Sequence, residues 1–184
     1  MRPFRFGIST SVADSGQEWR EKARKAEDLG FDVFCVADHI RQTFQPLVAL
    51  AVAAEATSRI RLGTMVINND FRHPVLLARE AATLDVLSSG RLELGIGAGH
   101  SGDEYREAGI PFDPAKVRVA RLSEAVQVMK QLWAGGATSF AGRTTPFRST
   151  PRSQSRLKSR FPSPSEATGG RCSNSRAVRR RSWG

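Results

Sequence analysis

The sequence predicts an α/β protein built on parallel strands. Four short apolar segments, each expected to form a strand, are followed by segments with apolar residues at helical spacing. The strands are expected near residues 4–8, 32–37, 60–67 and 91–97. Short connections between alternating strands and helices imply parallel strands joined by right-handed crossovers. Two architectures satisfy this pattern, an open doubly wound sheet and consecutive units of an eight-fold barrel, and periodicity does not choose between them.

Residues that start and stop helices mark the first three units. Ser15 and Glu18 have the spacing of a capping box, in which the two side chains satisfy free amides at a helix start. Gly30 stands where a glycine commonly ends a helix. Pro46 and Pro74 are expected at first helical positions, where the missing amide of proline is not needed.

The last helix is expected only after a longer loop. Its apolar stripe begins near Pro114 and stops at Gly135. The segment after Gly102 carries only a weak helix signal and is interrupted by Pro111. A short strand around residues 139–140 is expected to begin a fifth unit.

The positive charge is confined to one end of the chain. The formal net charge is +10, yet residues 1–142 hold 17 basic and 17 acidic side chains. Residues 143–184 hold 11 basic side chains and the single acidic Glu166. The chain is therefore not a uniformly basic nucleic-acid binder.

We expect residues 1–142 to form the folded domain and residues 143–184 to be a disordered basic tail. The tail is rich in Arg, Ser and Pro, and Leu157 and Val178 are its only aliphatic side chains larger than alanine. Such a segment buries too little apolar surface to offset the entropy of ordering it. Its charge could bind phosphate backbones, but without aromatic interleaving that binding would be unspecific.

Composition also predicts the compartment. Two cysteines give no disulfide framework, and no apolar run is long enough to span a membrane. The N-terminus lacks the apolar stretch of a signal peptide. We therefore expect a cytoplasmic protein with no membrane partner.

Asp38 and His39 directly follow the second predicted strand. In a barrel, residues at the C-terminal ends of strands face the active site, and an imidazole suits a general acid or base. The alternative is that Asp38 caps the following turn and His39 simply packs. A second segment, Arg72-His73-Pro74, could contact an anion at a helix N-terminus, but we interpret it as an ordinary helix start.

A glycine-rich segment follows the fourth predicted strand. Gly97 to Gly102 match G-x-G-x-x-G, but a dinucleotide site needs an acidic residue at the end of the next strand. Glu124 has that spacing and falls inside a predicted helix, so we interpret the match as accidental. The glycines still allow close approach of the backbone to a ligand. No histidine pair has a metal-ligand spacing, and no metal site is predicted.

Three consecutive runs of sequence carry a resemblance to a known family. They are residues 63–74 (GTMVINNDFRHP), 76–88 (LLAREAATLDVLS) and 90–99 (GRLELGIGAG). This pattern resembles the luciferase-like monooxygenase superfamily, in particular its actinobacterial coenzyme F420-dependent oxidoreductases, over residues 3–142. The resemblance implies a (β/α)8 barrel, of which this chain would be the N-terminal half, with the cofactor at the C-terminal mouth of the strands.

The resemblance also implies roles for particular residues. Asp38 and His39 match the family's catalytic pair, in which the histidine handles a proton during hydride transfer. His100 stands where the family often has tryptophan. The positions that match the cofactor site lie at the ends of the third and fourth strands: Thr64, Asn68, Asn69, Gly97 and Gly99.

The function that the resemblance implies is hydride transfer between coenzyme F420 and a small organic substrate. The alternatives are an FMN-dependent monooxygenase of the same superfamily and a non-catalytic protein with a nucleic-acid-binding tail. Because the family's chains are nearly twice as long, we expect a truncated barrel half whose reading frame shifts after Gly142. We expect such a chain to aggregate or to depend on homodimerisation, and to have negligible activity.

Overall fold

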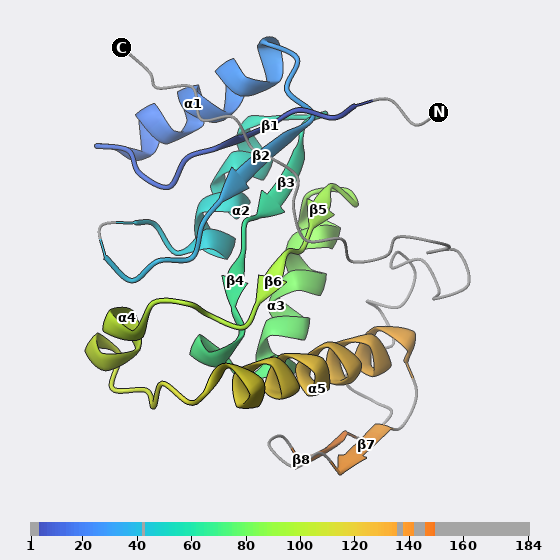
Figure 1. Ribbon diagram of the computed structural model, residues 1–184. Coiled ribbons are helices and arrows are strands. Elements are labelled where there is room, and N and C mark those ends of the chain that lie inside the picture. Colours follow the sequence, from blue (N-terminus) through green and yellow to red (C-terminus); the bar gives the residue numbers. More distant parts are fainter. Residues whose placement is uncertain (1–3, 42, 136–137, 142–145, 150–184) are drawn as a thin grey trace.

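The computed structural model describes residues 4–41, 43–135, 138–141 and 146–149 (Figure 1). Strands and helices alternate along most of this range, as the sequence predicts. The strands are β1 (Gly7–Ser9), β2 (Val33–Val36), β3 (Arg61–Thr64), β4 (Ile67–Asn68), β5 (Leu92–Glu93), β6 (Ile96–Gly97), β7 (Thr138–Ala141) and β8 (Pro146–Ser149). The helices are α1 (Gly16–Asp28), α2 (Pro46–Ala56), α3 (Pro74–Leu87), α4 (Gly102–Glu107) and α5 (Ala115–Ala134), with a 3-10 turn, η1, at Asn69–Phe71.

The central sheet is parallel, and its strands follow chain order. Four strands pair in the order β1-β2-β3-β5, and every pairing among them is parallel. An order without reversal means that each crossover advances in the same direction, so there is no switch point of the kind a doubly wound sheet requires. The topology therefore favours barrel units over the doubly wound alternative.

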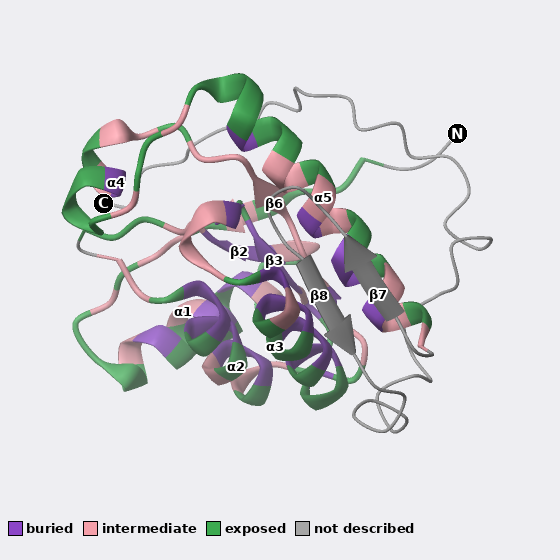
Figure 2. Ribbon diagram, turned by 90° about the horizontal axis from the view of Figure 1, so that it is seen from below, coloured by how far each residue is buried: buried purple, intermediate pink, exposed green. Residues whose placement is uncertain are grey.

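The core lies between this sheet and the helices. Phe34, Leu62 and Leu92 are aligned across β2, β3 and β5 and are all buried. Helices α1, α2 and α3 lie side by side and turn their buried residues toward the strands (Figure 2). Trp19 of α1 is 1% exposed, and its indole N–H donates to the carbonyl of Ala49 in α2 at 2.8 Å. This bond satisfies the one polar group of the buried indole.

The predicted helix boundaries are confirmed where the signal is local. Ser15 caps α1 by accepting the N–H of Glu18, whose carboxylate accepts the N–H of Asp14. Gly30 follows the end of α1 with φ of 77°. Pro46 and Pro74 both occupy the first turn of their helices, as predicted.

The third and fourth predicted strands are each split, contrary to the expected continuous runs at 60–67 and 91–97. Residues 65–66 separate β3 from β4, and residues 94–95 separate β5 from β6. The peptide bond between Met65 and Val66 is cis. The distal pieces β4 and β6 pair in parallel with each other and form a small sheet of their own.

A half-buried carboxylate shapes the turn that leads into β3. Glu27, at the end of α1, accepts hydrogen bonds from the N–H groups of Ser58, Arg59 and Ile60. Burial alone would raise the pKa of Glu27, but these three donors stabilise its ionised form and hold the pKa below its usual value. The ionised carboxylate of Glu27 therefore holds the backbone of residues 58–60 in place.

Beyond α5, strands β7 and β8 form an antiparallel pair. β7 covers the strand expected around residues 139–140, and β8 lies within the segment that composition predicts to be disordered. Residues 150–184, which hold most of the predicted tail, lie outside the described residues. No helix among the described residues combines the length and apolarity that a membrane crossing needs.

Candidate active site

The predicted site residues gather where the parallel strands end. Asp38 and His39 follow β2, Asn68 ends β4, and Gly97 ends β6. The side chain of Asp38 accepts the backbone N–H of Asn68 at 2.8 Å, which joins the loop after β2 to the end of β4. One edge of the fold therefore carries the residues that the sequence placed at separate strand ends.

Asp38 holds two loops together at this edge of the fold. Its side chain is 6% exposed, and that of its ion-pair partner Arg72 is 16% exposed. Arg72 holds the carboxylate in a two-pronged contact, with Nη2 3.0 Å from Oδ1 and Nη1 bonded to Oδ2. Both oxygens thus have protein donors, an arrangement that fixes two loops relative to each other. A catalytic role for Asp38 stays a prediction.

His39 is an accessible titratable residue of the site. Its side chain is 42% exposed, and its Nδ1 lies 2.8 Å from Oε1 of Glu104, on α4. The His100 ring meets the His39 ring edge-on, with 6.0 Å between ring centroids. His39 also lines an open cavity of about 360 Å³, whose other walls include Ile40, Phe71 and Ile110. An imidazole in this position can exchange a proton with a bound molecule.

The end of β3 is hydrogen-bonded to the chain between β5 and β6. The Thr64 hydroxyl donates to the Gly95 carbonyl at 2.7 Å and accepts the Gly95 N–H at 2.8 Å. Thr64 itself is buried, whereas the next two residues, Met65 and Val66, are 37% and 46% exposed. The break in the strand therefore presents apolar side chains to solvent beside the buried polar ones.

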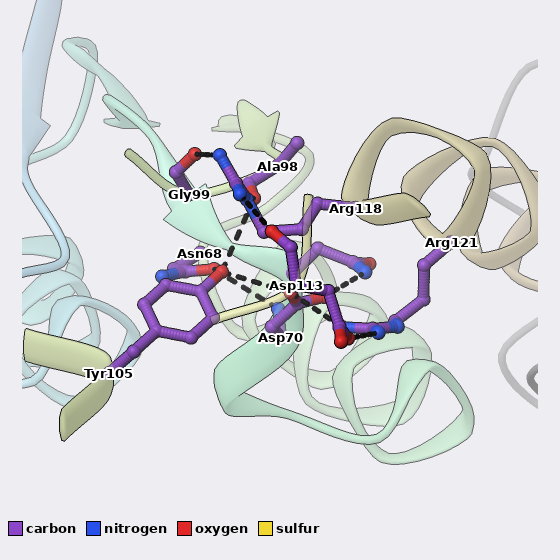
Figure 3. A network of polar contacts seen from close by, with 9 residues as sticks. Asn68, Asp70, Ala98, Gly99, Tyr105, Asp113, Arg118 and Arg121 are labelled. Atoms are coloured by element: carbon purple, nitrogen blue, oxygen red, sulfur yellow. Dashed lines mark hydrogen bonds and ion pairs between the residues drawn. The ribbon is translucent and has the colours of Figure 1, made fainter. Parts of the chain in front are cut away.

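A buried tyrosine organises the other side of the site (Figure 3). The Tyr105 hydroxyl lies 2.9 Å from Oδ2 of Asp70, 3.0 Å from Oδ1 of Asn68 and 3.2 Å from the carbonyl of Ala98. One hydroxyl proton thus faces three acceptors. Burial and the hydrogen bond to Asp70 raise the pKa of Tyr105 to about 12, so the phenol stays protonated at neutral pH.

Two arginines of α5 complete this network. Arg121 joins Asp70, whose side chain is 1% exposed, to Asp113, with a distance of 2.7 Å to Asp70. Burial opposes the charge of Arg121, but its two carboxylate partners outweigh burial and raise its pKa. Arg118 donates to the carbonyl of Ala98 at 3.2 Å. The start of α5 is thereby fixed against the strand ends.

The glycines and Asn69 differ in their surroundings. A side chain at Gly97 would meet Val66 at 2.7 Å, and one at Gly99 would meet the Tyr105 oxygen at 2.1 Å. These two positions need glycine for packing within the chain itself. Asn69 is 4% exposed, and its Oδ1 has no hydrogen-bond partner among the described residues. Contact of these three residues with a cofactor stays a prediction.

Sequence reasoning missed the residues that hold this site together. The segment of helix α4 carried only a weak helix signal, and its residues Glu104 and Tyr105 were not among the predicted site residues. Asp70 and Arg72 stand within the quoted family run, and their charges directly after a strand were a usable signal. His73 caps α3 by accepting the N–H of Val75, in agreement with its interpretation as part of a helix start. Groups of ligands suited to a metal are not found in the described part of the chain.

Comparison with known proteins identifies the family. Residues 2–169 match the family model described as luciferase-like monooxygenase. The chain belongs to this family. The F420-dependent glucose-6-phosphate dehydrogenase of Intrasporangium calvum is 39% identical to this luciferase-like chain over 132 residues, or 64% of the chain and 38% of the relative. The luciferase-like chain thus spans less than half the length of that relative.

Solved structures of the family share the fold. Monooxygenase RslO1 from Streptomyces bottropensis superposes with a TM-score of 0.71 and 30% identity, over 84% of this luciferase-like chain and 51% of that one. The coenzyme F420-dependent tetrahydromethanopterin reductase from Methanopyrus kandleri has a TM-score of 0.71 and 28% identity, over 80% and 45% of the two chains. These likenesses confirm the predicted fold class, in which strands β1 to β6 belong to the first units of a (β/α) barrel.

Proposed function

We propose that this chain carries part of the active site of a coenzyme F420-dependent oxidoreductase, which transfers a hydride between the deazaflavin and a small organic substrate. The observation that carries the proposal is the position of His39. This accessible imidazole stands at the strand edge, in a fold whose relatives include enzymes named as F420-dependent. The names of those relatives indicate the cofactor, and the geometry provides a residue that can accept or donate a proton.

The residues at this edge fit a flat heteroaromatic ring. Such a ring needs apolar contact on its face and polar groups at its rim. Met65 and Val66 are exposed apolar side chains at the strand break. The Oδ1 of Asn69 is a buried acceptor without a hydrogen-bond partner among the described residues, and an acceptor of this kind is suited to an N–H donor on a ligand. We infer that Met65, Val66 and Asn69 would hold the ring.

The remaining site residues handle the proton or hold the site in shape. When bound, the deazaflavin supplies the hydride chemistry. His39 holds or accepts the proton that accompanies hydride transfer, and Asp38 fixes the loop from which His39 projects. Thr64 and Asn68 use their side chains within the protein, so we infer that they shape the site through the backbone.

Binding of the cofactor is the direct test. The 184-residue chain is titrated with F420 and, separately, with FMN, and the absorbance and fluorescence of each are followed. We expect F420 to bind, and Asn69→Ala to weaken its affinity about tenfold, the equivalent of one hydrogen bond. The same variant should change the free energy of unfolding little, since the one hydrogen bond it removes, to Asp70 at 3.2 Å, is lost together with a buried acceptor that has no partner among the described residues. Absence of F420 binding would contradict the proposal.

An FMN-dependent monooxygenase is the second candidate, because the solved relative at 30% identity is named a monooxygenase. Tight binding of FMN without binding of F420 would favour this candidate. Where F420 binds, turnover is assayed first with glucose 6-phosphate, the substrate in the name of the curated relative. The expectation that the 184-residue chain has negligible activity stays a prediction that this assay tests.

The basic tail has its own test. Deleting residues 143–184 removes the whole charge excess of the chain. If the chain binds DNA in a salt-sensitive way, the deletion should abolish that binding. Salt-sensitive binding that survives the deletion would show that the tail is not its cause.

A further inference from the structure

Glu104 contacts His39 from α4, a helix that the sequence indicates only weakly. The two residues are 65 positions apart, and Oε1 of Glu104 lies 2.8 Å from Nδ1 of His39. The Glu104 side chain is 12% exposed, whereas that of His39 is 42% exposed. A largely buried carboxylate thus faces one nitrogen of an accessible ring.

We propose that Glu104 is a positioning residue that fixes the His39 ring with its proton on Nδ1 and leaves Nε2 free to accept a proton. The inference rests on the proposed function, because it assumes the proton-handling role of His39. A carboxylate only accepts hydrogen bonds, so the contact requires a proton on Nδ1. In a neutral imidazole the other nitrogen, Nε2, then carries the lone pair. Among the described residues, Nε2 makes no hydrogen bond of its own.

The fold holds Glu104 in place from two sides. Tyr105, the next residue of α4, is fully buried, and its hydroxyl bonds to the end of β4 and to Asp70. Glu107 forms an ion pair with Arg41, in the loop that carries His39. Residues 104 and 107 are three apart and share one face of the helix. The acidic face of α4 therefore meets His39 and Arg41 together, and the carboxylate of Glu104 is fixed relative to the ring.

A purely structural role for Glu104 would be to tie α4 to the loop after β2. Glu107 already makes such a tie through Arg41, on the same helix face. The two acidic residues thus offer a matched pair of variants. Glu104→Ala removes the acceptor of the ring proton, and Glu107→Ala removes a tie between the same two segments without touching the ring.

The tautomer of His39 is read from long-range ¹H–¹⁵N correlation spectra of the ¹⁵N-labelled 184-residue chain. The sequence has three histidines, so His73→Asn and His100→Asn assign the signals. Spectra are taken over a series of pH values, and the tautomer is read where the ¹⁵N shifts of the imidazoles no longer change with pH. We expect the parent chain to show His39 with its proton on Nδ1.

Glu104→Ala should abolish this preference and give a population with the proton on Nε2, whereas Glu107→Ala should keep the parent pattern. Circular dichroism of each variant checks that the fold is intact. A parent chain with the proton on Nε2, or an unchanged tautomer in folded Glu104→Ala, would overturn the proposal. An equal change in both variants would show that Glu104 only ties α4 and would also overturn it. These spectra need no cofactor, so a failed F420 titration and a failed tautomer test are separate results.

Discussion

Replacing Tyr105 with phenylalanine removes one hydroxyl group and leaves a fully buried ring in place. The ring keeps its contacts with Phe71 and Phe112, at centroid distances of 5.2 Å and 4.9 Å. Each acceptor of the lost proton also keeps another donor. Asp70 retains Arg121, Asn68 Oδ1 retains the N–H of Asp70, and Ala98 retains Arg118. Because no acceptor is left unpaired, Tyr105→Phe should lower the free energy of unfolding by only about 1–2 kcal/mol at pH 7.

The same difference should depend on pH in a definite direction. Burial raises the pKa of Tyr105 from 10.0 to about 12 in the folded chain. Above pH 10, the phenol therefore ionises in the unfolded chain while it stays protonated in the native one. Native Tyr105 then binds more protons than unfolded Tyr105, so the parent chain loses about 1.4 kcal/mol of stability per pH unit as pH rises from about 10 toward 12. Tyr105→Phe lacks this term, and the two stabilities should converge near pH 11.

Urea unfolding followed by tryptophan fluorescence, repeated from pH 7 to pH 11, measures this convergence. Tyr105 is the only tyrosine of the chain, so the ultraviolet absorbance of the phenolate reports its ionisation directly. We expect ionisation at a markedly higher pH in the native chain than in the chain unfolded by urea. A stability difference that is constant with pH, or a native phenol that ionises near pH 10, would refute the network drawn around Tyr105.

Three further changes test other parts of the structure. Gly99→Ala should lower the free energy of unfolding by about 3 kcal/mol in a denaturation assay, because its Cβ would meet the Tyr105 oxygen at 2.1 Å. Gly30→Ala is the matched control, because Gly30 has a similar φ of 77° and nothing within 4 Å of the added Cβ. It should lower the same free energy by about 1 kcal/mol. Glu27→Gln should destabilise the chain by about 1 kcal/mol at pH 7, and because the folded pKa of Glu27 is lowered, the parent should lose this advantage as pH falls below about 4.5 in acid titrations. Burial, with a smaller effect from a nearby carboxylate, raises the pKa of the Cys35 thiol to about 11. A disulfide reagent should therefore modify Cys35 only on unfolding, which is measured in a variant whose other cysteine is replaced by serine.

Features that depend on neighbouring residues could be predicted from the sequence. The cap formed by Ser15 and Glu18, the helical starts at Pro46 and Pro74, and the glycine after α1 each follow from a few consecutive side chains. The four strands expected between residues 4 and 97 were also found in parallel pairing. The placement of Asp38 and His39 at the end of β2 followed from the same periodicity.

Features that depend on distant partners could not be predicted in this way. The division of the third strand is accompanied by two bonds from Thr64 to Gly95, 31 residues away. Helix α4 has only six residues, and its Tyr105 is fixed by contacts with the end of β4. The ion pair of Asp70 with Arg121 joins residues 51 positions apart. No local pattern pairs such distant residues with each other, and for that reason the partners Glu104, Tyr105 and Arg121 of the candidate site were missed.

The division of the strands places much of the candidate site on a sheet separate from the main one. The ladder between β4 and β6 has two residue pairs, Ile67 with Ile96 and Asn68 with Gly97. Its attachment to the rest of the fold relies on the hydroxyl of Thr64 and on the polar groups around Tyr105. A ladder this short opens at a lower free energy than the four-stranded sheet, so its amide protons should exchange with solvent through local opening, while those of β2 and β3 wait for global unfolding. A molecule that binds at this edge would then slow exchange in β4 and β6 and leave the main sheet unchanged.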